Sequence, residues 1–225
     1  MNPLQAEFFT RFGLYAEREF LSPDVCAGVR AEMSSATSAP ATVADGQEGR
    51  AVDETHRRTK LADVSAETAA LVGGALQNAL PTLAQHFGRK LVGMQPPQFL
   101  LYREDSFFRP HRDDSEKPGA PGFVRQRSVS AVVFLNGATP EESSGYSGGS
   151  LTFYGLMDDS ADGRNVGLPI AGETGLLIAF PSDLLHAVSA VTAGERYSVV
   201  TWFFEDATLS GSERLTTASA APPAA

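Results

Sequence analysis

The sequence predicts a mainly β protein with flanking helices, in which a sandwich or jelly-roll core follows an N-terminal helical segment. Beyond about residue 93, short runs rich in β-branched and aromatic residues alternate with clusters of Gly, Pro, Asp and Ser. Earlier in the chain, two stretches carry helix-start signals instead. With 225 residues, of which 42% are hydrophobic and 20% charged, the chain can bury a sizeable core.

The same change of character predicts the domain organisation. We expect one domain over residues 1–207, with helical support from 1–92 and the β core from 93–207. Residues 208–225 are small and polar, with too little apolar bulk to dock, and are predicted to form a flexible tail.

Two helices are predicted before the β core. The first starts at Ser22-Pro23-Asp24, where an N-cap residue, a first-turn proline and a first-turn acid stand in a row. The second is predicted from Ser65 to about Ala79, with Pro81 limiting it. Residues 34–49 between the helices are small, polar and proline-broken, and they predict a loop.

The β core is predicted from the short runs themselves. Gly, Pro, Asp and Ser clusters bound each run, as expected of strands joined by turns. The runs are FLLYRED, SVSAVVFLN, GSLTFYG, TGLLIAF, LLHAVSAV and RYSVVTWFF.

Composition excludes several classes of partner and site. A net charge of −9 argues against nucleic acid, because no excess of Lys and Arg is present to neutralise phosphates. Neither a signal peptide nor an apolar run of 18 residues is visible, so we expect a cytoplasmic protein with no membrane partner. Cys26 is the single cysteine, so any transition-metal site must use His and carboxylate ligands. The oligomeric state stays open.

The stretch FRPHRDDSE, residues 108–116, holds the first candidate ligands. On a strand, residues i and i+2 point to the same face about 6.6 Å apart, so His111 and Asp113 can converge on one ion. Asp114 is an alternative carboxylate, but it falls on the opposite strand face. With 27 acidic residues in the chain, this spacing alone is weak evidence.

His186 is the further evidence. Inside an apolar run, a lone His is more often a hydrogen-bonded core residue. Together with His111 and Asp113, however, it completes two imidazoles and one carboxylate, the facial triad of non-haem Fe(II) sites.

A co-substrate anchor is predicted ten residues after His186. VTAGERYS reads as a hairpin turn around Ala193-Gly194 that pairs residue 191 with 196. This pairing places Arg196 roughly 16 Å from His186, measured along the hairpin. The planar guanidinium of Arg196 suits a carboxylate, because it can form two parallel hydrogen bonds with it. The alternative is that Arg196 is a charged residue on the surface of the hairpin. Ser198 shares the face of Arg196 and can add a hydrogen bond. Trp202 shares it too, either as the pocket floor or as core packing.

These residues carry a resemblance to a known family. The segment from about residue 99 to 204 resembles the 2-oxoglutarate- and Fe(II)-dependent oxygenases, particularly the prolyl 4-hydroxylase-like branch. That branch orders a Tyr, an HxD pair, a Gly-Gly-x-Leu-x-Phe strand, a distal His and a basic residue. The corresponding elements here are Tyr102, His111-Arg112-Asp113, GGSLTF from Gly148 to Phe153, His186 and Arg196.

The resemblance implies a double-stranded β-helix (jelly-roll) core, Fe(II) held by His111, Asp113 and His186, and 2-oxoglutarate and O2 as co-substrates. Tyr102 is implied to donate its hydroxyl to the distal carboxylate of 2-oxoglutarate; strand-edge packing is the alternative. Asp113 favours hydroxylation over chlorination, since related halogenases carry a small residue there. Whether ascorbate is needed stays open.

The predicted function is a dioxygenase that couples oxidative decarboxylation of 2-oxoglutarate to hydroxylation of a C–H bond, in a small molecule or amino acid derivative. Alternatives are a prolyl or peptidyl hydroxylase acting on a protein, and a non-enzymatic jelly-roll module that binds a metal or ligand. Phe108 stands where the branch often carries a second Tyr, which weakens the inference of a peptidyl proline.

Substrate choice is predicted to lie with three polar segments, residues 53–60, 114–127 and 137–149, which can cover a barrel mouth. Within the first two, a substrate carboxylate has three candidate partners, each of which is more often a solvated charge: Arg57, Arg58 and Arg127. The two remaining histidines, His56 and His86, lie in the helical half and are predicted to be solvent or packing residues.

Overall fold

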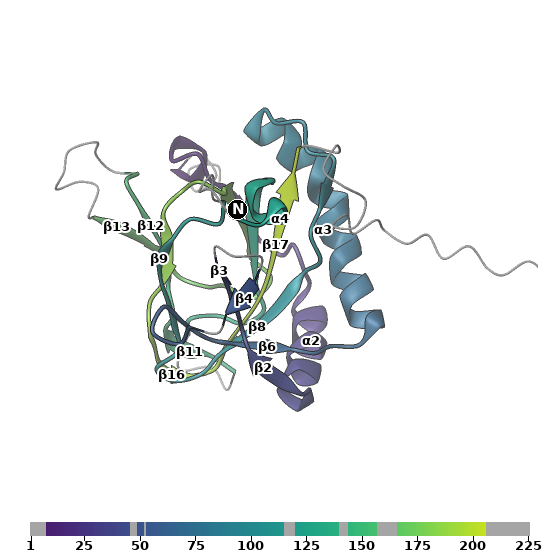
Figure 1. Ribbon diagram of the computed structural model, residues 1–225. Helices are drawn as coiled ribbons and strands as arrows, with labels where there is room; N and C mark the ends of the chain where they lie inside the picture. The colour runs from purple at the N-terminus through teal and green to yellow at the C-terminus, as the bar shows by residue number, and fades with distance from the viewer. Residues whose placement is uncertain are drawn as a thin grey trace, which may run out of the picture.

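The computed structural model describes residues 8–45, 49–51, 53–114, 120–139, 144–156 and 166–205 (Figure 1). Two antiparallel sheets pack face to face, and two helices cover the outer face of the larger one. The predicted mainly β class, with an N-terminal helical segment and a jelly-roll core, is confirmed. The domain boundaries stay predictions, and the predicted tail lies outside the described residues.

The helices described are α2 (Pro23–Ser35), α3 (Ala66–Phe87) and α4 (Gly122–Arg125). The strands of the N-terminal part are β1 (Tyr15–Glu17), β2 (Ser38–Pro40), β3 (Val43–Asp45), β4 (Gly49–Ala51), β5 (Arg57–Arg58) and β6 (Lys60–Ala62). The later strands are β7 (Gly93–Met94), β8 (Gln98–Tyr102), β9 (Phe107–His111), β10 (Arg127–Phe134), β11 (Tyr146–Gly148), β12 (Leu151–Tyr154), β13 (Gly167–Ile170), β14 (Leu177–Pro181), β15 (His186–Val188), β16 (Val191–Gly194) and β17 (Arg196–Phe204).

The larger sheet has the strand order β1-β14-β10-β17-β8-β6-β2, with β7 also pairing β17. The smaller sheet has the order β13-β12-β15-β9-β5, and β11-β16 and β3-β4 form separate pairs. In Figure 1, α2 and α3 lie on one side of β17, whereas β9, β12 and β13 lie on the other. The central strands β10 and β17 are therefore buried on both faces, which explains their nearly continuous apolar sequence.

The period of two along these strands sorts side chains between two cores. Val129, Ala131 and Val133 of β10 pack with the helices, whereas Val132 and Phe134 pack between the sheets. Strand β17 alternates in the same way, with its odd-numbered residues 197, 199 and 203 in the helix-side core. Its even-numbered side chains consequently point toward the smaller sheet.

Helix α2 begins where the sequence predicts. The Ser22 hydroxyl accepts a hydrogen bond from the backbone N–H of Val25 at 3.3 Å, and proline occupies the first helical position. Cys26, Val29 and Met33 are buried against the larger sheet. The i, i+3, i+7 spacing of these three residues gives one apolar face, so packing rather than intrinsic propensity stabilises this helix.

Helix α3 starts at the predicted Ser65 cap, but the prediction that it ends near Ala79 is wrong. The helix passes through Pro81 and ends at Phe87, with Gly88 in the left-handed conformation that terminates many helices. A proline inside a helix costs about 3 kcal/mol. That cost is offset because the buried stripe of the helix continues beyond the proline. The stripe comprises Val72, Leu76, Ala79 and Leu83.

The predicted loop at residues 34–49 is also wrong in part, because β2, β3 and the start of β4 fall within it. Strand β2 pairs with β6 at the rim of the larger sheet. Its three residues are half-buried or exposed, so it needs none of the apolar bulk by which sequence reasoning recognises a strand.

The predicted hairpin between residues 191 and 196 does not form. Strand β16 pairs with β11, and β17 pairs with β8 and β10 instead. The chain passes from the β11-β16 pair to the larger sheet through Gly194, whose φ of +74° favours glycine. A Cβ at Gly194 would also lie 2.6 Å from the Gly145 carbonyl oxygen. Gly194 therefore has the backbone conformation that favours glycine, but the predicted strand pairing is wrong.

No helix among the described residues is long and apolar enough to span a membrane.

The outer strands of both sheets are short. The larger sheet ends in β1 and β2 with three residues each, and the smaller one in β13 with four and β5 with two. Two of them carry a proline, Pro40 in β2 and Pro169 in β13.

Candidate active site

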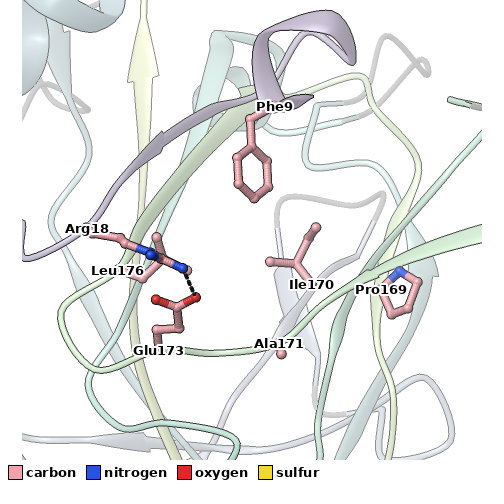
Figure 2. A pocket seen from close by; sticks show the side chains of 7 residues that line it. All are labelled: Phe9, Arg18, Pro169, Ile170, Ala171, Glu173 and Leu176. Carbon is pink, nitrogen blue, oxygen red and sulfur yellow. Dashed lines mark hydrogen bonds and ion pairs between the residues drawn. The ribbon is translucent and has the colours of Figure 1, made fainter. Parts of the chain in front are cut away.

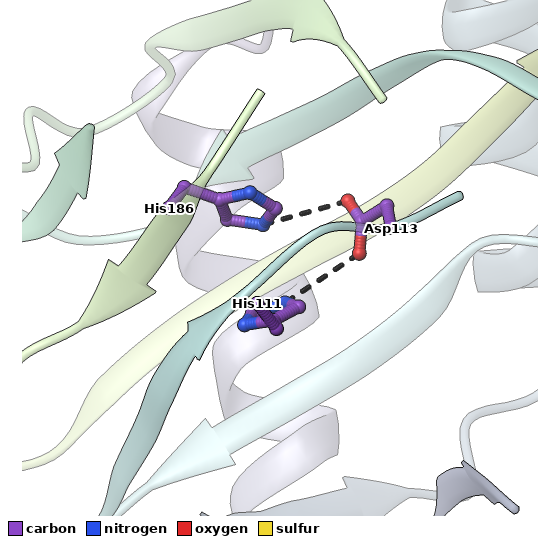
Figure 3. A group of neighbouring side chains, drawn as sticks. All are labelled: His111, Asp113 and His186. Atoms are coloured by element: carbon purple, nitrogen blue, oxygen red, sulfur yellow. Dashed lines mark ion pairs between the residues drawn. The ribbon is translucent and has the colours of Figure 1, made fainter. Parts of the chain in front are cut away.

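Three predicted ligands converge between the sheets. His111 ends β9 and His186 begins β15, and the antiparallel register pairs these two residues directly. Asp113 follows β9, where its backbone N–H donates to the Ser182 carbonyl oxygen at 2.9 Å. One ligand atom from each of the three residues lies within 4.8 Å of the others (Figure 3). Two strands and one adjoining bend therefore bring two imidazoles and a carboxylate to one point.

Both imidazoles are held so that Nε2 faces the carboxylate. Nδ1 of His111 lies 2.8 Å from the Arg109 carbonyl oxygen, and Nδ1 of His186 lies 2.9 Å from that of Leu184. Because a carbonyl oxygen only accepts, each Nδ1 carries the proton and each Nε2 keeps its lone pair. The two Nε2 atoms lie 3.5 Å from the two oxygens of Asp113, beyond hydrogen-bond range.

Electrostatics favours the metal-binding protonation states. Burial raises the pKa of Asp113, but the nearby His186, His111 and Arg127 outweigh it and hold that pKa well below its usual range. Burial lowers the pKa of His186 to about 4, and the Asp113 carboxylate only partly opposes this shift. At neutral pH the site thus offers a neutral imidazole at position 186 beside an ionised carboxylate. A donor set of two His and one carboxylate fits Fe(II).

A second buried cluster holds the remaining predicted residues. Arg196 pairs with Tyr102 across β17 and β8, and its guanidinium carbon lies 4.8 Å from the Tyr102 ring centroid. Its Nη1 donates to Ser198 Oγ at 2.9 Å. Arg196 is only 1% exposed, yet no described residue forms an ion pair with it or accepts a hydrogen bond from its Nε. A buried cation in this state needs an anion.

Tyr146 belongs to this cluster, and sequence reasoning missed it. Its hydroxyl is buried without a hydrogen-bond partner among the described residues; burial raises its pKa, and Arg196 opposes the rise. Gly149 lets the two side chains meet, since a Cβ there would lie 3.0 Å from Arg196 Cδ and 3.2 Å from Tyr146 Cε2. Two adjacent orphan donors suit a carboxylate, so the cluster fits the far end of a dicarboxylate.

The other polar candidates stay out of the metal cluster. The Asp114 backbone N–H donates to Ser182 O at 3.2 Å, and Asp114 is absent from the metal-binding group found among the described residues. The His56 ring lies 6.4 Å from that of His111, nearer than its place in the sequence suggested, but it is no member of the group. His86 packs against Tyr15, with ring centroids 5.2 Å apart.

Arg127 and Trp202 brace the segment that carries Asp113. The Arg127 guanidinium carbon lies 3.6 Å from the Trp202 ring centroid, and its Nη1 donates to the Asp113 carbonyl oxygen at 3.2 Å. Gln95 accepts from its Nε at 3.2 Å. These contacts engage Arg127 within the protein and give Trp202 a packing partner. Residues 115–119 and 140–143 of the predicted substrate segments lie outside the described residues.

A separate pocket of about 220 Å³ lies elsewhere, beside β13 and the loop that follows it (Figure 2). Phe9, Ile170 and Leu176 line its apolar part. Its two charged residues, Arg18 and Glu173, bond each other at 2.7 Å, so neither presents an uncompensated charge. None of the predicted site residues lines it.

Comparison with known proteins agrees with this geometry. Residues 97–204 match the family model of the 2OG-Fe(II) oxygenase superfamily. A PKHD-type hydroxylase of Beijerinckia indica subsp. indica is 39% identical over 108 residues, which cover 48% of this chain and 42% of that protein. The chain spans about half the length of the curated relatives that it matches.

Two solved structures share the fold. A prolyl 4-hydroxylase of Pseudomonas putida superposes with a TM-score of 0.63 at 22% identity, covering 92% of this chain and 100% of that one. A prolyl hydroxylase of Trichoplax adhaerens, in complex with a hypoxia inducible factor peptide fragment, superposes with a TM-score of 0.64 at 16% identity. The match covers 91% of this chain and 94% of that one. The predicted resemblance is confirmed. Residues 97–204 are thus similar to the 2OG-Fe(II) oxygenase superfamily, and the fold of the chain is prolyl 4-hydroxylase-like.

Proposed function

We propose that the chain is a 2-oxoglutarate-dependent dioxygenase that hydroxylates an unactivated C–H bond in a small molecule or amino acid derivative. The observation that carries the proposal is that the chain contains both a metal-ligand cluster and a cluster of buried donors. His111, Asp113 and His186 offer ligand atoms within 4.8 Å of one another, and Arg196 and Tyr146 offer buried donors without partners among the described residues.

In this proposal His111, Asp113 and His186 hold Fe(II). When bound, Fe(II) with 2-oxoglutarate and O2 supplies the oxidation that converts C–H to C–OH, while 2-oxoglutarate leaves as succinate and CO2. The chain's own part is to fix the ligands. The backbone carbonyls of Arg109 and Leu184 set both imidazole tautomers, and Ser130 Oγ donates to the Asp113 carboxylate at 2.7 Å.

The buried Arg196 cluster holds the far carboxylate of 2-oxoglutarate. The Arg196 fork supplies charge-assisted hydrogen bonds, and the Ser198 hydroxyl, which already accepts from Arg196, has a proton left to donate. Tyr102 and Tyr146 add phenol donors. Because the cluster is buried, each of these bonds is worth more than on the surface.

Phe108 supports a small substrate over a peptidyl proline. Its ring stacks on His111 with centroids 3.5 Å apart and an angle of 17°, so a ring without a hydroxyl covers the first metal ligand. A peptide substrate is the second candidate, since the Trichoplax relative was solved with a peptide. Succinate release across amino acid derivatives, proline peptides and folded proteins decides between them. Release with peptides or proteins alone would reverse our order.

The test of the reaction class is spectroscopic. Anaerobic addition of Fe(II) and 2-oxoglutarate to the purified chain is expected to give a visible metal-to-ligand charge-transfer band, because the keto acid chelates the metal at the His-Asp-His site. Zn(II) in place of Fe(II) is the control. A jelly-roll module that binds a ligand without this chemistry would give no band with either metal.

Tyr146→Phe tests the co-substrate cluster. The loss of one hydrogen bond to a charged group is expected to raise the dissociation constant for 2-oxoglutarate about tenfold, corresponding to about 1.4 kcal/mol. Titration of the anaerobic band measures it, and the band at saturation should keep its position. Tyr154→Phe, on half-buried β12, is the matched control. Equal affinities in both variants would remove Tyr146 from the co-substrate cluster.

A further inference from the structure

Arg57 lies beside the metal cluster without belonging to it. It sits on β5 and pairs with Phe108 of β9, and its guanidinium carbon lies 4.7 Å from the Phe108 ring centroid. The same ring stacks on His111. A cation, an aromatic ring and a metal-ligating imidazole therefore lie in contact in that order.

The buried guanidinium of Arg57 forms no ion pair with any described residue. Arg57 is 7% exposed, its Nη1 donates to the Thr42 carbonyl oxygen at 3.0 Å, and its Nε has no described partner. Burial lowers its pKa, and electrostatic interactions with Tyr102 and Asp113 only partly oppose that shift. The Thr42 carbonyl and the Tyr102 phenol can satisfy hydrogen bonds of Arg57, but neither neutralises its charge.

Asp113 attracts the charge of Arg57 but forms no ion pair with it. Its Oδ1 faces His111 and its Oδ2 faces His186, each at 3.5 Å, and Oδ2 also accepts from Ser130. Both oxygens are thus directed at the metal cluster and its support. An anion that pairs directly with Arg57 must therefore come from outside the described protein residues.

We propose that Arg57 binds a carboxylate of the molecule that is hydroxylated, which makes the substrate an anion. The inference rests on the proposed function and extends it to a substrate class. A planar guanidinium fork suits a carboxylate, and a buried site built for that charge discriminates strongly against a neutral analogue. We assign this carboxylate to the substrate rather than to 2-oxoglutarate because Arg196 and Tyr146 already supply two unpartnered donors for the co-substrate.

The test compares matched pairs of probes. N-acetylated amino acids, each as free acid and as primary amide, are titrated by calorimetry under nitrogen into the chain loaded with Fe(II) and 2-oxoglutarate. For the wild type, the tightest free acid is expected to bind at least about tenfold better than its amide. In Arg57→Gln the ratio of the amide dissociation constant to the acid dissociation constant is expected to fall to about one. Arg57→Lys keeps the charge without the fork, so its ratio should lie between those of the wild type and Arg57→Gln.

Arg58→Gln is the matched control, because Arg58 is the exposed neighbour on the same strand and should keep the wild-type ratio. A wild-type ratio near one, or an unchanged ratio in Arg57→Gln, overturns the inference. Weakened 2-oxoglutarate binding with an unchanged ratio also overturns it and assigns Arg57 to the co-substrate. A missing charge-transfer band in the wild type would reject the proposed function instead, so the two failures are distinguishable.

Discussion

Replacing His186 with alanine is expected to eliminate both the anaerobic charge-transfer band and succinate release. His186 supplies one of three ligand atoms, and its buried position leaves no other described histidine, aspartate or glutamate to replace it in the metal-binding group. Loss of about 4 kcal/mol of transition-state stabilisation corresponds to about a thousandfold in rate. Succinate release and metal content after dialysis measure the effect, and circular dichroism melting checks that the variant folds.

His56→Gln is the control for this experiment. The His56 ring lies 6.4 Å from His111, so it shares the neighbourhood but not the ligand set. This variant should keep the band. If His186→Ala retained the band while His56→Gln lost it, the metal would be bound by a different set of residues.

Replacing Arg196 with methionine is expected to change function and stability in opposite directions. The dissociation constant for 2-oxoglutarate should rise at least about a hundredfold, because two charge-assisted hydrogen bonds of about 1.5 kcal/mol or more are lost. The ligand-free protein should melt at an equal or higher temperature. Its 1% exposed guanidinium has no described ion-pair partner, and a buried charge replaced by an apolar side chain is often neutral or stabilising.

Arg103→Met is the matched control for Arg196. Arg103 forms an exposed ion pair with Glu195 at 2.9 Å, so its loss should cost less than about 1 kcal/mol and leave 2-oxoglutarate binding intact. Lower thermal stability in Arg196→Met, together with unchanged 2-oxoglutarate affinity, would mean that Arg196 stabilises the fold and does not anchor the co-substrate.

The metal cluster could be predicted because each ligand has a local signal and the resemblance to the oxygenase family connects the three. His111 and Asp113 are two residues apart, and His186 is a polar residue in an otherwise apolar strand. The period of two likewise predicted that Ser198 lies beside Arg196, and the two form a hydrogen bond. The starts of α2 and α3 could be predicted because Ser22 and Ser65 are residues that favour the N-cap position.

The errors have a common physical origin, because each depends on partners distant in the sequence. Tyr146 reaches Arg196 only because β11 pairs with β16, and no spacing rule connects residues so far apart. For the same reason the predicted hairpin around Gly194 is wrong, because the flanking strands β16 and β17 pair with other strands. Helix α3 continues past Pro81 because tertiary packing outweighs a local rule.

The short outer strands limit how two molecules of this chain can associate through their sheet edges. An exposed strand rim presents unpaired backbone groups that a second molecule can extend, and long flat rims lead to aggregation. Here β1, β2, β5 and β13 each offer at most four residues, and Pro40 and Pro169 lack the N–H that an added strand would need. The rims of these two sheets are therefore protected against edge-to-edge polymerisation.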